Sequence, residues 1–350
     1  YTLLREAQSL TGYERSDAAL ELLWRMTQHG IRTRLHGGWM RKRFETSSAV
    51  MDVSFSPSAI NFLTAQADHS MRMWSMKTGE CLKVLSGHTN LVASLCFAPN
   101  GREAISGSDD RTVRTWDLNT GRNVLVLKGH TESVSCVAYS GDGNLALSGS
   151  WDKTIRLWRL ADGGLVKIIK GHEDRITSAD FIRGSDHIIS AGFDGIVKMW
   201  DVSSGRALRD LKGHKDRIMA LRVSPRGNLL LSGSADGTVR LWAVRTGNCL
   251  KTIEVSQSGV RTVAFCPDEK FFATGTDNAV IGVWSVDTGE CQREFQGHSR
   301  EITGVQFSYS GRFIISSSAD GAVNVWELDW DWQFDPRRPL KATPPSVDDD

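Results

Sequence analysis

The sequence predicts an all-β protein, a β-propeller of seven four-stranded blades. Tryptophan recurs at a constant interval of 42 residues through most of the chain, and each interval contains the same series of short β-rich runs. The recurring residues are Trp74, Trp116, Trp158, Trp200, Trp242, Trp284 and Trp326. A period near 40 to 45 residues with strand-like patterning is typical of propeller blades, which bury their faces against one another.

The fifth unit, residues 213–253, shows how each blade is expected to form. It contains four runs rich in aliphatic and β-branched residues, RIMALRV, LLLSGS, TVRLWAV and CLKTI, separated by SPRG, ADG and RTG. Pro, Gly, Asp and Ser favour turns, and Gly also adopts the left-handed conformation that hairpin turns require. The last separator recurs in other units as KTG, NTG, SSG and DTG. Each unit therefore predicts four antiparallel strands joined by short turns.

A Gly-His pair lies near the start of five units, and Asp117 and Asp201 follow their tryptophans directly. The pairs are Gly87-His88, Gly129-His130, Gly171-His172, Gly213-His214 and Gly297-His298. With these residues the chain resembles the WD40 repeat family over roughly residues 39–328. The resemblance implies a seven-bladed propeller that holds other macromolecules, similar to the WD40 modules of larger bacterial multidomain signalling proteins.

The two ends of the repeat region predict how the ring closes. The seventh unit ends after its Trp326 strand, and residues 39–44, WMRKRF, align with the outer strand CLKVLS at 81–86. We expect this N-terminal strand to complete the last blade and to cover its free edge. The propeller is assigned to residues 33–328. Residues 1–32 have helical spacing of apolar residues and form a helical extension or a linker, and the Pro-rich, charged residues 329–350 form a disordered tail.

A His, Asp, Ser and Trp recur together in the second, third, fourth, fifth and seventh units. The Asp lies six residues before the Trp and the Ser ten residues before it. A His between a loop Asp and a strand Ser can hydrogen-bond to both, and the indole N–H can join the chain of bonds. The predicted structural network comprises His88, Asp110, Ser106, Trp116, His130, Asp152, Ser148, Trp158, His172, Asp194, Ser190, Trp200, His214, Asp236, Ser232, Trp242, His298, Asp320, Ser316 and Trp326.

The catalytic alternative for these residues is a serine hydrolase triad. A triad occurs once per active site, whereas this set occurs five times and no nucleophile elbow accompanies it. We therefore predict no catalytic residue and no enzymatic activity. The sequence also contains no phosphate-binding, zinc-binding or calcium-binding motif, so no cofactor and no metal are expected.

Two positions of the repeat vary sharply between units, which leaves them free for recognition. The position before the Asp is Ala67, Asp109, Trp151, Phe193, Ala235, Asp277 and Ala319. The position three residues after the His is Ala49, Leu91, Ser133, Arg175, Arg217, Gly259 and Glu301. By resemblance to WD40 proteins, both loops open onto one top face around the channel. We predict a partner-binding patch there, since exposed aromatic and Arg residues are typical interface anchors. Its members are Trp151, Phe193, Arg175 and Arg217, extended by Leu91 and Asp109. The alternative is that the two aromatic residues only pack against neighbouring loops.

Composition limits the remaining possibilities. Lys and Arg total 42 against 41 for Asp and Glu, so no overall charge favours nucleic acid or an anionic membrane. Six cysteines occur without a CxxC pair, and Cys81, Cys249 and Cys291 repeat one strand position, where we expect them to be buried. These features predict a reducing, cytoplasmic setting.

The function predicted from the sequence is a non-catalytic protein–protein interaction scaffold or sensor module, part of a larger protein. It is expected to be a monomeric propeller whose partner is a protein, a peptide or another domain of its own chain, and not a nucleic acid or a membrane. A propeller that binds a small ligand or nucleic acid remains the alternative.

Overall fold

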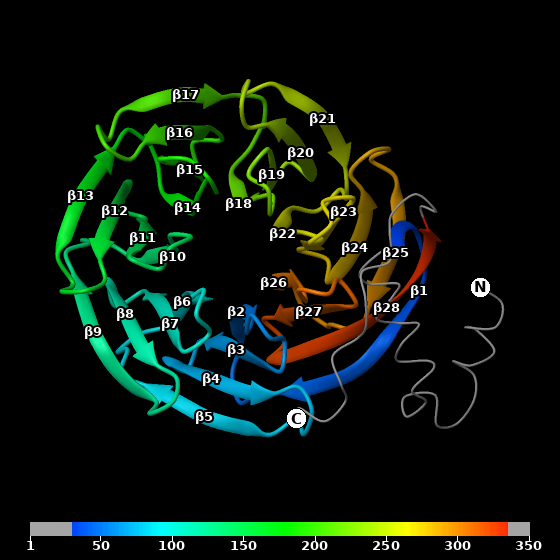
Figure 1. Ribbon diagram of the computed structural model, residues 1–350, viewed down its shortest axis with the longest axis horizontal. Coiled ribbons are helices and arrows are strands. Elements are labelled where there is room, and N and C mark those ends of the chain that lie inside the picture. The colour runs from blue at the N-terminus through cyan, green and yellow to red at the C-terminus, as the bar shows by residue number, and fades with distance from the viewer. Residues whose placement is uncertain (1–29, 335–350) are drawn as a thin grey trace. The chain divides into compact units, whose positions relative to one another are not determined.

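The computed structural model of the protein describes residues 30–334, which contain strands β1 to β28. The strands form seven four-stranded antiparallel sheets, and residues 39–327 arrange these sheets as blades around a common axis (Figure 1). The prediction of an all-β, seven-bladed propeller is therefore confirmed. Within residues 30–334 no helix is long and apolar enough to cross a membrane.

Each of the first six blades consists of four consecutive strands, and the first strand of each lies nearest the axis (Figure 1). Blade 1 contains β2 (Val50–Phe55), β3 (Asn61–Gln66), β4 (Ser70–Ser75) and β5 (Cys81–Ser86). Blade 2 contains β6 (Val92–Phe97), β7 (Glu103–Ser108), β8 (Thr112–Asp117) and β9 (Arg122–Lys128). Blade 3 contains β10 (Val134–Tyr139), β11 (Leu145–Ser150), β12 (Thr154–Arg159) and β13 (Leu165–Lys170).

The remaining blades repeat this order up to the closing strand. Blade 4 contains β14 (Ile176–Phe181), β15 (His187–Gly192), β16 (Val197–Asp201) and β17 (Ala207–Leu211). Blade 5 contains β18 (Ile218–Val223), β19 (Leu229–Ser234), β20 (Thr238–Ala243) and β21 (Cys249–Glu254). Blade 6 contains β22 (Val260–Phe265), β23 (Phe271–Thr276), β24 (Val280–Ser285) and β25 (Cys291–Gln296). Blade 7 contains β26 (Ile302–Phe307), β27 (Phe313–Ser318), β28 (Ala322–Phe334) and β1 (Gly30–Glu45).

The turn between the second and third strands has the same unusual backbone in every blade. The residue after the recurring Asp or Asn has a positive φ of 65° to 81° in all seven turns. These residues are His69, Arg111, Lys153, Gly195, Gly237, Ala279 and Gly321. The left-handed residue reverses the chain so that the Asp carboxylate can accept the N–H two residues ahead, as Asp110 does from Thr112 at 2.9 Å. The turn therefore fixes the direction of the Asp side chain.

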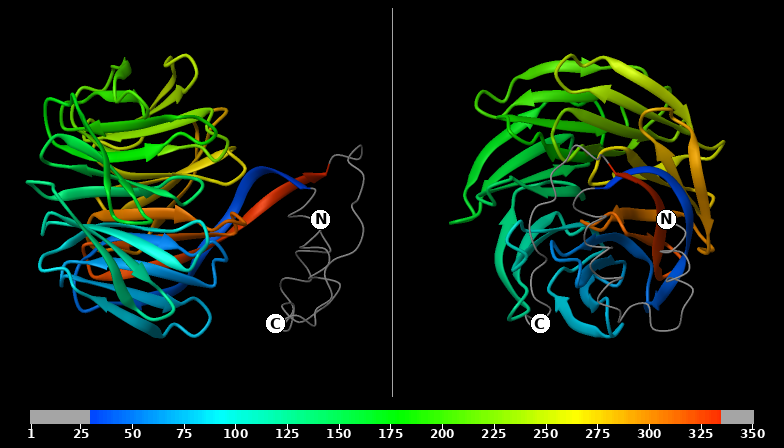
Figure 2. Two further views of the ribbon diagram at one scale, coloured as in Figure 1. Left: turned by 60° about the vertical axis from the view of Figure 1, so that its left-hand side comes forward. Right: turned by 45° about the vertical axis from the view of Figure 1, so that its right-hand side comes forward.

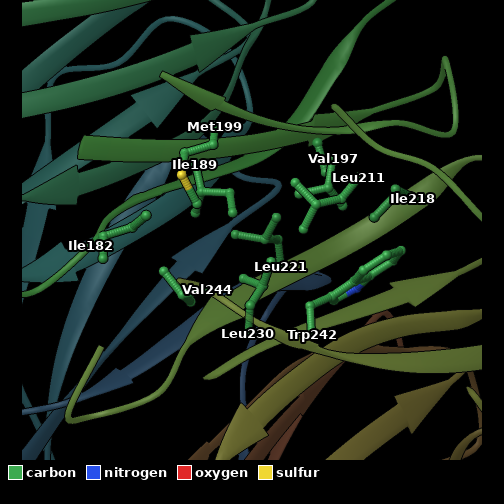
Figure 3. Close-up of a cluster of buried hydrophobic side chains, with 11 residues drawn as sticks. Ile182, Ile189, Val197, Met199, Leu211, Ile218, Leu221, Leu230, Trp242 and Val244 are labelled. Carbon is green, nitrogen blue, oxygen red and sulfur yellow. The ribbon is translucent and has the colours of Figure 1, made fainter. Parts of the chain in front are cut away.

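The core of the propeller lies between the blades. Figure 3 shows one cluster, in which β15, β16 and β17 of blade 4 face β18, β19 and β20 of blade 5. Trp242 is 2% exposed at this seam, and Ile189 and Leu221 are fully buried. At about 25 cal/mol per Å² of buried apolar surface, such seams supply most of the favourable free energy of folding. Each blade is therefore stable only beside its neighbours.

The N-terminal strand closes the ring, as predicted. β1 pairs with β28 in blade 7, and Figure 2 shows the two strands side by side. Near the end of β1, Phe44 packs edge-to-face on Phe62 of blade 1 with ring centroids 4.9 Å apart, and on Trp74 at 6.1 Å. One strand from the start of the chain thus joins the last blade to the first.

The predicted boundaries of the two ends are wrong by a few residues. β1 already begins at Gly30, within the range assigned to the helical extension, and β28 continues to Phe334, within the range assigned to the tail. The cause is that these strands pair with each other: the Thr33 hydroxyl donates to the Asp331 carbonyl at 3.2 Å. The rest of the predicted extension and tail, 1–29 and 335–350, lies outside the described residues.

The expectation that three repeated cysteines are buried is also wrong. Cys81, Cys249 and Cys291 are exposed because each begins the outermost strand of its blade, and no further strand covers that edge. All six cysteines are free thiols.

We expect the substitution Phe44→Ala to lower the free energy of unfolding by about 3 to 5 kcal/mol, the usual cost of removing a buried Phe side chain. Phe44 is 4% exposed and lies at the seam that closes the ring. Denaturant titration of the purified protein measures the change. The control is Trp39→Ala on the same strand, where the side chain is 52% exposed and the loss should stay below about 1 kcal/mol. Equal losses in the two variants would contradict a closing role for Phe44.

Candidate functional site

The recurring His, Asp, Ser and Trp form a continuous chain of hydrogen bonds inside each blade that carries all four. In blade 3, the His130 ring lies between Asp152 (Nδ1 to Oδ2, 2.8 Å) and Ser148 (Nε2 to Oγ, 2.8 Å). The indole N–H of Trp158 donates to the same Ser148 hydroxyl at 2.9 Å. The equivalent contacts in blades 2, 4, 5 and 7 measure 2.7 to 3.1 Å. All twenty predicted members of the network thus lie in the predicted arrangement.

The electrostatics of the network in blades 5 and 7 favour a neutral imidazole. Burial lowers the pKa of His214 and His298, and the attraction of their carboxylate partners offsets this only in part. Burial alone would raise the pKa of the paired carboxyls, but hydrogen bonds from the His ring and from backbone N–H groups hold it below its usual range. This holds for Asp110, Asp152, Asp194, Asp236 and Asp320.

In blades 5 and 7, a neutral His beside an ionised Asp fixes every proton in the chain. The Nδ1–H donates to the carboxylate, the Ser hydroxyl donates to Nε2, and the indole N–H donates to the Ser oxygen. Ser148 is fully buried and both of its hydrogen bonds are used, so its oxygen is not placed to attack a substrate. The network therefore ties the two loops at one end of the blade to its second and third strands.

Blades 1 and 6 retain only part of this chain. Trp74 donates to Thr64 and Trp284 donates to Thr274, each at 3.0 Å, but Thr46 and Ser256 stand where the other blades have His. The hydrogen bond between the second and third strands is therefore preserved in both blades. The hydrogen bonds through which a His joins the strand Ser to the loop Asp are absent from them.

The sequence analysis missed a second set of polar contacts on the inner strands. The Asp52 carboxylate of blade 1 accepts the Leu95 N–H of blade 2 at 3.0 Å, and the Gln306 side chain of blade 7 accepts the Phe55 N–H of blade 1 at 2.6 Å. These side chains satisfy backbone donors of the next blade and so hold adjacent inner strands together. Nothing in the repeat pattern marks them, because the other blades have different residues at the same positions.

Two inner carboxyls share one cation. Burial raises the pKa of Asp52 and of Asp180, although the attraction of Arg222 opposes this rise for both. Arg222 lies on β18, next to the blade that contains Asp180. Its charge therefore compensates carboxyl groups from two different blades, which fits a structural role near the axis.

The two variable positions singled out from the sequence are neighbours in space. In every blade the backbone N–H of the residue before the Asp donates to the carbonyl of the residue three after the His or its equivalent, as Phe193 does to Arg175 at 2.9 Å. The other pairs are Ala67–Ala49, Asp109–Leu91, Trp151–Ser133, Ala235–Arg217, Asp277–Gly259 and Ala319–Glu301, at 2.9 to 3.2 Å. These fourteen residues, which we call the top ring, run once around the same end of the seven blades.

Four residues of the top ring stack into an aromatic–arginine ladder, which consists of Trp151, Arg175, Phe193 and Arg217. The Arg175 guanidinium lies 4.4 Å from the Trp151 ring centroid and 5.9 Å from that of Phe193. The Arg217 guanidinium lies 5.0 Å from the ring centroid of Phe193. Such cation–π contacts contribute about 0.5 to 1 kcal/mol each at exposed sites. The ladder joins the top loops of blades 3, 4 and 5.

The two aromatic residues of the ladder pack against neighbouring loops and also remain partly exposed. Trp151 and Phe193 do contact neighbouring loops, through the arginines, yet Trp151 keeps 37% of its surface exposed and Phe193 is half-buried. Gly192, just before Phe193, permits this close approach, since a Cβ atom there would collide with the Arg175 carbonyl oxygen.

The two predicted extensions of the patch are joined less directly. The Asp109 carboxylate accepts a hydrogen bond from the Ser133 hydroxyl. The backbone carbonyl of Ser133 accepts the Trp151 N–H. Leu91 is connected to the patch only through its backbone bond with Asp109. The structure thus brings together the four ladder residues, places Asp109 beside them and leaves Leu91 at the end of the series.

The fold and the internal network define a β-propeller of repeated blades whose polar core is structural. Comparison with protein-family models supports this assignment with one family: the description WD domain, G-beta repeat matches seven segments, which are residues 39–75, 79–117, 121–159, 163–201, 205–243, 247–285 and 289–327. The chain belongs to the WD40 family. Propellers of this family generally serve as non-catalytic scaffolds for protein interactions. A comparison with curated proteins found no match.

We expect Ser148→Ala to destabilise the protein by about 1 to 3 kcal/mol, because it leaves the buried His130 Nε2 and the Trp158 N–H without partners. The matched control is Thr274→Val in blade 6, where only the Trp284 N–H loses its partner and the loss should be smaller. Denaturant unfolding of both variants gives the comparison. Equal losses would mean that the His adds nothing to the network.

We expect stability to be constant between about pH 6.5, the usual pKa of an unfolded His, and about pH 8, and to fall as the pH is lowered below about 6.5. The imidazoles of His214 and His298 bind a proton less readily in the folded protein than in the unfolded chain, because burial lowers their pKa. A second loss should follow below about pH 4, where the carboxylates of the network take up protons. Unfolding titrations between pH 8 and 5 test the first step, which should shrink in His214→Gln. A flat profile over that range in the parent protein would contradict this prediction.

Proposed function

We propose that this chain is a non-catalytic scaffold that binds a protein or peptide on the top ring of the propeller, within a larger protein in the cytoplasm. The observation that supports it best is the aromatic–arginine ladder. Large aromatic residues on a protein surface are typical interface anchors, and Arg and Trp are the residues most enriched among those that dominate binding.

The rigid base beneath the ladder also supports this function. Trp151 directly precedes Asp152, and Phe193 directly precedes Asp194, so each aromatic residue is attached to an Asp held by the buried His. A side chain fixed in this way loses little conformational entropy when a partner binds. The position of the ladder is thus set before any partner arrives.

The alternative functions have less support from the structure. A serine hydrolase would need an accessible Ser hydroxyl, and those of the network are buried. Nucleic-acid binding would need a basic surface, yet acidic residues accompany the arginines of the top ring, as Asp216 accompanies Arg217 at 3.6 Å. Within residues 30–334 no three His, Cys, Asp or Glu side chains gather in a way that could hold a metal ion.

The proposal is tested by affinity capture from cell lysate with quantitative mass spectrometry. We expect the double variant Trp151→Ala/Phe193→Ala to lose proteins that the parent captures, because both anchors of the ladder are removed. The control variant is Leu82→Ala/Leu250→Ala, which removes two exposed apolar side chains from the outer strands β5 and β21 and should keep those proteins. Circular dichroism verifies that both variants are folded. If the ladder variant captures the same proteins as the control, the contact surface is not the top ring.

A further inference from the structure

The guanidinium of Arg175 differs from that of Arg217 in that it lies over two aromatic rings and has no acidic partner among the described residues. The Trp151 and Phe193 rings lie on it at 4.4 and 5.9 Å, and no hydrogen bond or ion pair within the described part of the chain uses its side-chain N–H groups. The residue remains exposed to solvent. Because the donors of a guanidinium point outward in its own plane, stacking leaves all of them available to a ligand.

The neighbouring carboxylate is directed elsewhere. Asp174 accepts the backbone N–H of Arg175 at 2.7 Å, so it is engaged by the loop. Asp216 makes the same backbone bond to Arg217 at 2.7 Å, but its carboxylate also lies 3.6 Å from the Arg217 side-chain Nε. Among the arginines of the ladder, Arg175 is therefore the one whose charge has no acidic partner within the described residues.

The surrounding charge determines which anion fits. The two loops that contribute the arginines contain Glu173 and Asp174 before Arg175, and Lys215 and Asp216 before Arg217. The Lys153 ammonium also reaches this loop, where it donates to the Glu173 carbonyl at 2.8 Å, so four basic side chains face three acidic ones and leave one net positive charge. A phosphate group with about two negative charges would exceed this one net positive charge. A carboxylate has one charge and two oxygens that match the guanidinium edge, so it can be held by two parallel hydrogen bonds.

We propose that Arg175 is the recognition point for an Asp or Glu side chain of an acidic partner peptide, with the exposed part of Trp151 contacting the adjacent apolar residue of that peptide. This inference rests on the proposed function and names the chemistry of the partner. The stacked rings hold the guanidinium in place, so little of its side-chain entropy is lost on binding.

The test uses the full chain immobilised on beads and short labelled peptide mixtures as probes. The mixtures share a fixed central residue, which is Glu, Gln, Lys or phosphoserine, and are random at the flanking positions. We expect the Glu mixture to be retained about tenfold more than the Gln mixture, which is typical of a bidentate charged hydrogen bond. Arg175→Gln should reduce retention of the Glu mixture to the Gln level. Arg175→Lys should restore only part of it, because an ammonium group cannot supply the paired donors.

The matched control is Arg206→Gln, which changes the net charge equally and lies on an exposed hairpin of the same blade, away from the top ring. It should leave retention of the Glu mixture unchanged. Equal retention of the Glu and Gln mixtures, stronger retention of the phosphoserine mixture, or no effect of Arg175→Gln would each overturn the inference. Loss of all mixtures in Trp151→Ala, with none lost in Arg175→Gln, would overturn it while leaving the proposed binding face intact.

Discussion

Each blade is a sheet with two apolar faces, and neither face can be buried within the blade itself. This constraint determines the rest of the structure. A side chain such as Trp242 becomes buried only because blade 5 stands beside blade 4, and the same requirement passes from blade to blade until the ring must close. The chain meets it by returning β1 from its start to the last blade, where Phe44 extends the apolar seam into blade 1. The pairing of β1 with β28 also covers the outer edge of β28, so the last blade has four strands like the others.

Apolar packing between blades does not by itself hold the loops, and the His-centred network supplies that function. A buried His joins the strand Ser to the loop Asp, and the left-handed residue after that Asp directs its carboxylate toward the ring. Since the fold requires only these groups, the residue just before the Asp is free to vary. The same anchoring that makes the loop rigid therefore makes the adjacent position suitable for recognition. The ladder is the product of that freedom in blades 3, 4 and 5.

The sequence was sufficient for those features that repeat and insufficient for those that join unlike residues of different blades. The constant Trp interval predicted the blade count, and the spacing of His130, Ser148 and Trp158 predicted a network whose every contact is present. Comparison between repeats also identified the four residues of the ladder. It could not show that Arg175 lies over both rings, because its contact with Trp151 depends on how blade 3 meets blade 4.

The wrong or missing predictions concern features that the repeat pattern does not record. The expectation of buried cysteines failed because a repeated strand position indicates a fold requirement, and a position on the outermost strand need not be covered, as the exposed Cys81 shows. The contacts of Asp52 and Gln306 went unnoticed since each satisfies a backbone donor in the next blade, which leaves no periodic signal. The ends of β1 and β28 were misplaced because their pairing continues past the repeat that defined the blade.

The ladder also explains how the free protein tolerates a large aromatic residue at its surface. An exposed Trp is costly in water, and the Arg175 guanidinium reduces this cost by covering one face of the Trp151 ring. The ring in turn reduces the freedom of the guanidinium without satisfying its N–H donors. Each residue therefore stabilises the other while both keep a group that a partner can contact: the indole keeps exposed apolar surface, and the guanidinium keeps its N–H donors. In the proposed complex, an apolar residue beside a carboxylate would contact both groups at once, so the two halves of the ladder would act as one recognition element.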